Sequence, residues 1–264
     1  MVGEAYAGLV IRDPGRGAGH VCLAFDNRAD LEARAREFLA AGAATGELTR
    51  YIAAEEPTVP LPWLPLGDRY PEGVVIDPHA QVAVYAAATE DAVATGYTGL
   101  RVVADVTSLV RTPEQRDAFA RYEYLIDRYI PDHPYTAICA YDRADLGDAA
   151  IAELACMHSR ADARVPFQLH ACPPAEGSAA LTGELDLHAY DLLTTTLDRA
   201  DLPPADEVVL QASGLRFADH GALLRIERYA DDRGITVVLR DANGGVKRLA
   251  DMLGLSRLRV EAAR

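Results

Sequence analysis

The strongest constraint on the fold is an alternation of short apolar runs with longer helical segments over the first 160 residues. The runs at 21–25, 48–53, 100–105 and 135–142 have the length and composition of strands. Between them the pattern predicts helices over 29–42, 78–95, 113–129 and 147–158, whereas the Pro-rich segment 54–76 is expected to be irregular. Strands that alternate with helices predict a largely parallel sheet covered by helices in an α/β domain.

A different pattern follows from about residue 164. Two short strands, 167–171 and 179–185, are separated by Pro173-Pro174 and Gly177 and predict a hairpin. Three helices are expected: one near 187–197, one that begins after Asp219 as its N-cap, and one over 246–253. Strands are expected at 208–210 and 235–239. We therefore expect two domains, 1–163 and 164–264, the second being a small sheet with helices on one face.

The composition excludes some classes of partner. The formal net charge of −14 argues against nucleic acid and against an anionic membrane surface, both of which attract basic proteins. No apolar run reaches 18 residues and no hydrophobic leader is recognisable, so we expect a cytoplasmic protein. The four cysteines contain no CxxC pair and are predicted to be small buried residues, with a metal or redox site as the alternative: Cys22, Cys139, Cys156 and Cys172.

The C-terminal hundred residues resemble the STAS domains of anti-sigma-factor antagonists. Three stretches carry the resemblance in the order of that family: the Gly-Glu-Leu-Asp signature within 181–186, the strand and turn of 208–219, and the helix and turn of 249–255. The resemblance implies a domain that docks on a kinase-type anti-sigma factor. In that family an Asp ends the strand before a helix, and a Ser or Thr follows two residues later. The resemblance also implies that phosphorylation of this Ser or Thr reverses the docking, because phosphate adds negative charge to the docking surface.

The hydroxyl needed for that switch is absent. Asp219 is followed by His220 and Gly221, and Gly221 occupies the position that the resemblance assigns to the phosphorylated residue. Ser213 is the nearest hydroxyl, but its position favours a turn hydrogen bond over a phosphosite. We predict a docking region around Ser213, Asp219, His220 and Gly221 without the usual phosphorylation, and expect Gly221→Ser to restore it.

The N-terminal part resembles the MEDS sensory domain over roughly residues 20–160. The matching stretches are His20-Val21-Cys22, Gly96-Tyr97 with 99–102, Tyr122-Glu123, and 139–142, with His158 near a C-terminal histidine of the family. The resemblance implies a RecA/KaiC-like three-layer parallel-sheet domain that senses a ligand or another signal.

Nucleotide hydrolysis is not expected. A P-loop needs GxxxxGK[ST] after the first strand, whereas the glycine-rich stretch 15–19 precedes that strand and lacks Lys and Ser/Thr. The residues after the strand, 26–30, are acidic and would repel phosphate. No constellation of catalytic residues is recognisable, so we expect a non-enzymatic protein.

Polar residues near the strands define a candidate sensor pocket. Asp105 and Asp142 end strands, and such ends meet at one edge of a parallel sheet, where ligands bind. The predicted pocket comprises His20, Asp105, Glu123, Tyr141, Asp142 and His158; the alternative is that each caps a helix or satisfies a buried backbone group. The spacing of His20, His158 and a carboxylate fixes no metal geometry, so we expect neither a metal ion nor a cofactor.

The leading hypothesis is a sensor domain coupled to a partner-switching domain that binds a kinase-type anti-sigma factor or a related regulator. The alternative is a ligand-binding module whose STAS-like domain is only a docking or dimerising scaffold, and a nucleotide- or metal-dependent hydrolase is the third. A small-molecule ligand and a homodimer are compatible with the leading hypothesis and with the first alternative.

Overall fold

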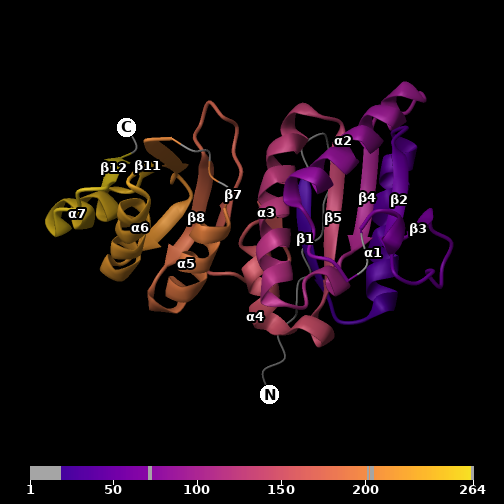
Figure 1. Cartoon of the computed structure of the whole chain (residues 1–264), viewed down its shortest axis with the longest axis horizontal. Helices are drawn as coiled ribbons and strands as arrows, with labels where there is room; N and C mark the ends of the chain where they lie inside the picture. The colour runs from indigo at the N-terminus through magenta and orange to yellow at the C-terminus, as the bar shows by residue number, and fades with distance from the viewer. Residues whose placement is uncertain (1–18, 71–72, 201, 203–204, 263–264) are drawn as a thin grey trace, which may run out of the picture.

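The first domain is built on a parallel sheet (Figure 1). The computed structural model describes residues 19–70, 73–200, 202 and 205–262. The strand order is β3-β2-β4-β5-β1-β6, and every pairing between these strands is parallel. The strands are β1 His20–Phe25, β2 Leu48–Ala53, β3 Trp63–Pro65, β4 Leu100–Asp105, β5 Tyr135–Asp142 and β6 Arg160–Ala161.

Helices cover both faces of this sheet. One face packs on α1, Arg28–Ala44, through Val21, Leu23 and Phe25, which alternate along β1. The intervening residues of β1 face the opposite layer, which contains α2 Pro78–Ala94, α3 Pro113–Tyr129 and α4 Arg143–Ala155. Short 3₁₀ turns complete the domain: η1 Leu66–Asp68, η2 Thr107–Leu109 and η3 Ile130–Asp132. The predicted α/β class with a parallel sheet flanked by helices is confirmed.

Local signals explain most helix boundaries. Asn27 and Asp77 cap α1 and α2 through their side chains, and Thr112 forms a capping box with Gln115 at the start of α3. The fourth helix begins at Arg143, where Asp142 accepts a hydrogen bond from the N–H of Ala144, but it is interrupted at Gly147, whose backbone is not helical (φ 76°, ψ 161°). The helix predicted from residue 147 corresponds to the part after this kink. The segment 54–76 is also not wholly irregular, since it contains β3 and η1.

The second domain contains a mixed sheet. The order is β10-β8-β9-β11-β12, all parallel, and β7 adds to β8 in the antiparallel hairpin that the sequence predicts. The strands are β7 Phe167–His170, β8 Ala179–Leu185, β9 Glu207–Gln211, β10 Leu215–Ala218, β11 Thr236–Ala242 and β12 Leu258–Ala262.

Helices pack on the apolar face of this second sheet. Along β9, Val208 and Leu210 are buried while Val209 and Gln211 are partly exposed, which is the alternation of a sheet covered on one side. The covering elements are η4 Leu187–Ala189, α5 Tyr190–Arg199, α6 His220–Arg233 and α7 Gly244–Leu253. Gly234 and Gly254 end α6 and α7 in left-handed conformations.

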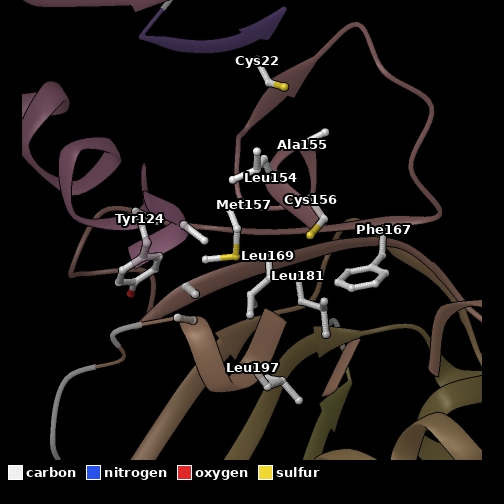
Figure 2. Packing of buried hydrophobic residues seen from close by; sticks show 14 of the residues in the cluster. Cys22, Tyr124, Leu154, Ala155, Cys156, Met157, Phe167, Leu169, Leu181 and Leu197 are labelled. Carbon is white, nitrogen blue, oxygen red and sulfur yellow. The ribbon is translucent and has the colours of Figure 1, made fainter. Parts of the chain in front are cut away.

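The two domains share one continuous hydrophobic core. Figure 2 shows Cys156 and Met157, which follow α4, pointing toward Leu169 of β7 and Leu181 of β8. Polar contacts reinforce this interface: the Tyr124 hydroxyl donates to the carbonyl of Ser178 at 2.5 Å. None of the helices in the described part of the chain is long and apolar enough to cross a membrane.

Candidate functional site

Four of the six predicted pocket residues meet in the buried layer between β1, β5 and α3. Glu123 of α3 lies at the centre, with its Oε2 atom 2.8 Å from Nε2 of His20 and 3.4 Å from Nε2 of His158. The Tyr141 hydroxyl donates to Oε1 of the same carboxylate at 2.5 Å. All four side chains are fully buried.

Cys139 completes this buried cluster. Its Sγ atom lies 3.4 Å from Nε2 of His20 and 3.6 Å from Oε2 of Glu123. One potential ligand atom from each of His20, Glu123, Cys139 and His158 lies within 4.8 Å of all the others. We call these four residues the His-Glu-Cys-His cluster.

The outer nitrogen of each histidine faces an acceptor. His158 Nδ1 lies 2.9 Å from the carbonyl oxygen of Leu154, one turn earlier. His20 Nδ1 lies 3.7 Å from Oδ1 of Asp127, which is one turn after Glu123 on α3. The Nε2 atoms of both rings are thereby directed toward the carboxylate of Glu123.

The electrostatics of the cluster follow from burial and from opposite charges at short range. Burial alone would lower the pKa of His20, but Glu123, Cys139 and Asp127 together outweigh it and raise that pKa well above its usual value. Burial likewise opposes ionisation of Glu123, but His158 and His20 outweigh it and lower the pKa of the carboxyl group. Burial, with the nearby Glu123, raises the pKa of the Cys139 thiol to about 12.

The structure places Asp105 and Asp142 away from this cluster. Asp142 pairs in register with Phe25, at the opposite end of β1 from His20, so about 15 Å of strand separates them. Asp105 accepts hydrogen bonds from the N–H and hydroxyl groups of Thr107, and burial raises the pKa of its carboxyl group. Asp142 caps α4. The six predicted residues therefore do not line one pocket, and these two have the structural roles that were the alternative.

The predicted docking region lies at the start of α6. Asp219 caps this helix, and both of its carboxylate oxygens accept hydrogen bonds from the Tyr190 hydroxyl at 2.8 Å. A Cβ atom on Gly221 would lie 2.0 Å from that hydroxyl oxygen. The Tyr190 side chain would therefore have to move to admit the side chain of a Gly221→Ser variant, and restored phosphorylation of that variant stays a prediction. Ser213 is exposed in the β9–β10 turn, and His220 is exposed at the helix start.

The comparison with protein families agrees with the geometry of the first domain. The family model for MEDS, the methanogen/methylotroph DcmR sensory domain, matches residues 19–159, more than half of the 264-residue chain. The chain belongs to the MEDS family. The match covers all four residues of the His-Glu-Cys-His cluster and ends just before β6. No curated protein matches the chain.

Cys139 is the member of the MEDS-domain cluster that the sequence analysis missed. The sequence favours a small buried residue over a metal or redox site at this position, and Cys139 is buried. Its position two residues before Tyr141 on β5 was the available signal, since alternate residues of a strand share a face. Glu123 carried a similar signal, a carboxylate among the buried positions Phe119, Tyr122 and Ile126 of α3.

The loop after β1 of the MEDS domain has no phosphate-binding geometry. In the described residues only Asp26 and Asn27 separate β1 from α1, and Asn27 uses its side chain to cap that helix. Arg143 pairs with Asp26 at 3.0 Å. The glycine-rich stretch 15–19 lies outside the described residues except for Gly19.

Two surface hollows lie where the MEDS domain meets the second domain. One, of about 270 Å³, is lined by Arg128, Cys172, Arg240 and neighbours. The other, of about 630 Å³, lies between Arg121 of α3 and the α5 and α6 residues Asp198, Tyr229 and Arg233. Neither hollow includes a residue of the predicted sensor pocket or of the predicted docking region.

Proposed function

We propose that this protein is a non-catalytic signalling regulator, in which the MEDS domain receives the signal and the second domain binds a protein partner. Membership of the MEDS sensory family supports the signalling role. We infer that the partner is a kinase-type anti-sigma factor or a related regulator, because residues 181–186 and 208–219 have STAS-like sequence features. A RecA/KaiC-like first domain without a P-loop and a STAS-type second domain belong to the same proposal.

The observation that carries the proposal is the direct hydrogen bonding between the cluster and the second domain. The carbonyl of His158 accepts a hydrogen bond from the side-chain amide of Gln168 on β7 at 2.7 Å. The N–H of Leu169 donates to the carbonyl of Cys156 at 2.7 Å. These hydrogen bonds connect His158 and its neighbour Cys156 directly to β7, the first strand of the second domain. They provide a route by which a displacement of His158 would change the position of β7.

The surface around Asp219 supports partner binding. Leu187 of η4, Phe217 of β10 and Leu224 of α6 are exposed by 64%, 49% and 45%. These large apolar side chains belong to η4, β10 and α6, the last two of which flank Asp219 in the chain, and exposed apolar side chains are candidates for contact with a partner. We call Leu187, Phe217 and Leu224 the apolar docking surface.

The test is binding of the full-length protein to kinase-type anti-sigma factors from its own organism, measured by surface plasmon resonance. We expect Phe217→Glu to weaken the complex at least tenfold, because a buried charge replaces an apolar contact. Val93→Glu, at a similarly exposed apolar position on α2, is the control and should bind as the wild type does. Absence of binding by the wild type, or equal binding by Phe217→Glu, would contradict the proposed partner.

The geometry of Gly221 favours a second candidate, a ligand-binding module whose second domain is a scaffold without a phospho-switch. Tyr190 fills the space where a phosphorylated side chain would lie. Incubation with the anti-sigma factor and ATP, followed by peptide mass spectrometry, separates the two candidates. Phosphate on Ser213 or a neighbouring hydroxyl supports a switch, whereas an unmodified protein that still binds its partner supports a scaffold.

A further inference from the structure

The geometry points to a metal site in the His-Glu-Cys-His cluster, which binds a divalent transition ion of the zinc class through His20, Glu123, Cys139 and His158. This differs from the sequence-based expectation of no metal ion. The proposed metal site does not depend on the proposed partner, because metal content and partner binding are measured separately.

The distances between the donor atoms fit a tetrahedral ion. Zinc binds nitrogen and oxygen at about 2.0–2.2 Å and sulfur at about 2.3 Å, so the edges of a regular tetrahedron are about 3.3–3.8 Å. Three of the observed separations are close to this range: 3.4 Å from His20 to Cys139, 3.4 Å from His158 to Glu123 and 3.6 Å from Cys139 to Glu123. A fourth of the six separations, from His20 to Glu123, is 2.8 Å and would open slightly around an ion. The remaining two, from His158 to His20 and to Cys139, are within 4.8 Å.

The surroundings of the ligands are those of a metal centre. A metal-bound histidine almost always directs its other ring nitrogen to a carbonyl or carboxylate, which fixes the tautomer and the ring orientation. His158 Nδ1 faces the Leu154 carbonyl and His20 Nδ1 faces Asp127. The hydroxyl of Tyr141 holds Oε1 of Glu123, which leaves Oε2 directed at the two imidazoles.

A buried polar atom without a hydrogen bond supports the same assignment. His158 Nε2 and His20 Nδ1 are both buried without a hydrogen bond among the described residues, although such atoms are rarely left unsatisfied. Of the two, His158 Nε2 faces the cluster, 3.4 Å from Oε2 of Glu123. An ion would supply the missing interaction. A dication with one thiolate and one carboxylate also forms a site of zero net charge, which lowers the cost of burying charged groups.

The donor set selects the class of ion. Two imidazole nitrogens, a thiolate and a carboxylate suit borderline transition ions such as Zn²⁺, whereas Mg²⁺ and Ca²⁺ require oxygen ligands. Four protein ligands at full burial define a closed, structural site without a position for a reacting water molecule. The ion would connect β1, α3 and β5 to His158, which lies between α4 and β6.

The experiment measures zinc in the purified full-length protein and in protein refolded from denaturant with ZnCl₂, by plasma mass spectrometry. We expect about one ion per chain, which resists dialysis against a weak chelator. Refolding with CoCl₂ should give visible d–d bands of a tetrahedral ion and a sulfur-to-cobalt charge-transfer band in the near ultraviolet. These spectra need no variant, so they test the site even where a substitution impairs folding.

Matched variants locate the ligands. Cys139→Ala should abolish the charge-transfer band and reduce retained zinc at least tenfold. The control is Cys22→Ala, because Cys22 is equally buried and pairs in register with Cys139, but lies outside the ligand set. Substoichiometric zinc after both preparations, or equal retention by Cys139→Ala and the wild type, would overturn the proposal and leave a hydrogen-bonded cluster only.

Discussion

At the scale of single residues, the second residue of α6 is restricted to glycine by a neighbouring tyrosine. A Cβ atom on Gly221 would lie 2.0 Å from Oη and 2.4 Å from Cζ of Tyr190, whose ring is fixed by Asp219 and by Arg225 above it. Gly221→Ala should therefore lower the free energy of unfolding by about 1–3 kcal/mol, as overpacking does. Urea denaturation measures the loss.

Two companion variants isolate the cause of that loss. Gly244→Ala, at the start of α7, meets no atom closer than 4.0 Å and should change stability by less than about 0.5 kcal/mol. In a Tyr190→Ala background the cost of Gly221→Ala should fall, because the clashing ring is gone. An additive double mutant would show that the ring does not cause the restriction.

The residues of the candidate site were only partly predictable. The sequence named His20, Glu123, Tyr141 and His158, which the structure brings together. It also named Asp105 and Asp142, which end their strands, whereas His20 begins its strand. Starts and ends of parallel strands lie at opposite edges of a sheet, so this separation was available from the predicted topology, and the register of β1 on β5 confirms it.

At the scale of elements, α6 holds the turn before the last strand through one carboxylate. Glu227 accepts hydrogen bonds from the N–H groups of Ser256 and Arg257 and from the Ser256 hydroxyl, at 2.8–3.0 Å. Burial opposes the charged form, but these donors outweigh it and lower the pKa of Glu227. We expect Glu227→Gln to reduce the free energy of unfolding by about 1–2 kcal/mol at pH 7.

The pH dependence of this effect has a defined sign. Because the folded-state pKa is depressed, the stabilisation is present above the unfolded pKa of about 4.3 and is lost as pH falls through the folded value. The difference between the wild type and Glu227→Gln should thus shrink in urea titrations at progressively lower pH. Glu184→Gln, on an exposed pair with Arg216, is the control. A difference that stays constant with pH would contradict this role for the carboxylate.

The regular elements were predictable where a periodic pattern was long. Strands β4 and β5 and helix α3 match the sequence-based ranges, since each has a clear apolar pattern and α3 begins at a proline after a capping threonine. Strands β3 and β6 have only three and two residues, too few to show a period. Such short edge strands form because a neighbouring strand is available, which is tertiary information.

At the scale of the whole molecule, one arginine joins both domains. Arg199 ends α5, is only 6% exposed, and contacts Asp117 of α3 at 2.7 Å and Glu153 of α4 at 2.9 Å. Both carboxylates belong to the MEDS domain. Since the domains also share a hydrophobic core, we expect the wild type to unfold in a single calorimetric transition.

Removing this charge should uncouple the domains. Arg199→Met keeps most of the side-chain volume but removes the partner of Asp117 and one of the two arginine partners of Glu153, which keeps Arg116. We therefore expect a loss of about 1–3 kcal/mol and a broadened or divided transition. Arg228→Met is the control, because Arg228 is 83% exposed and pairs with Asp232 within α6. If Arg199→Met unfolds like Arg228→Met, in one transition at the same temperature, the ion pairs do not couple the domains. A divided transition would instead identify Arg199 as a residue through which the MEDS domain and the second domain act as one cooperative unit.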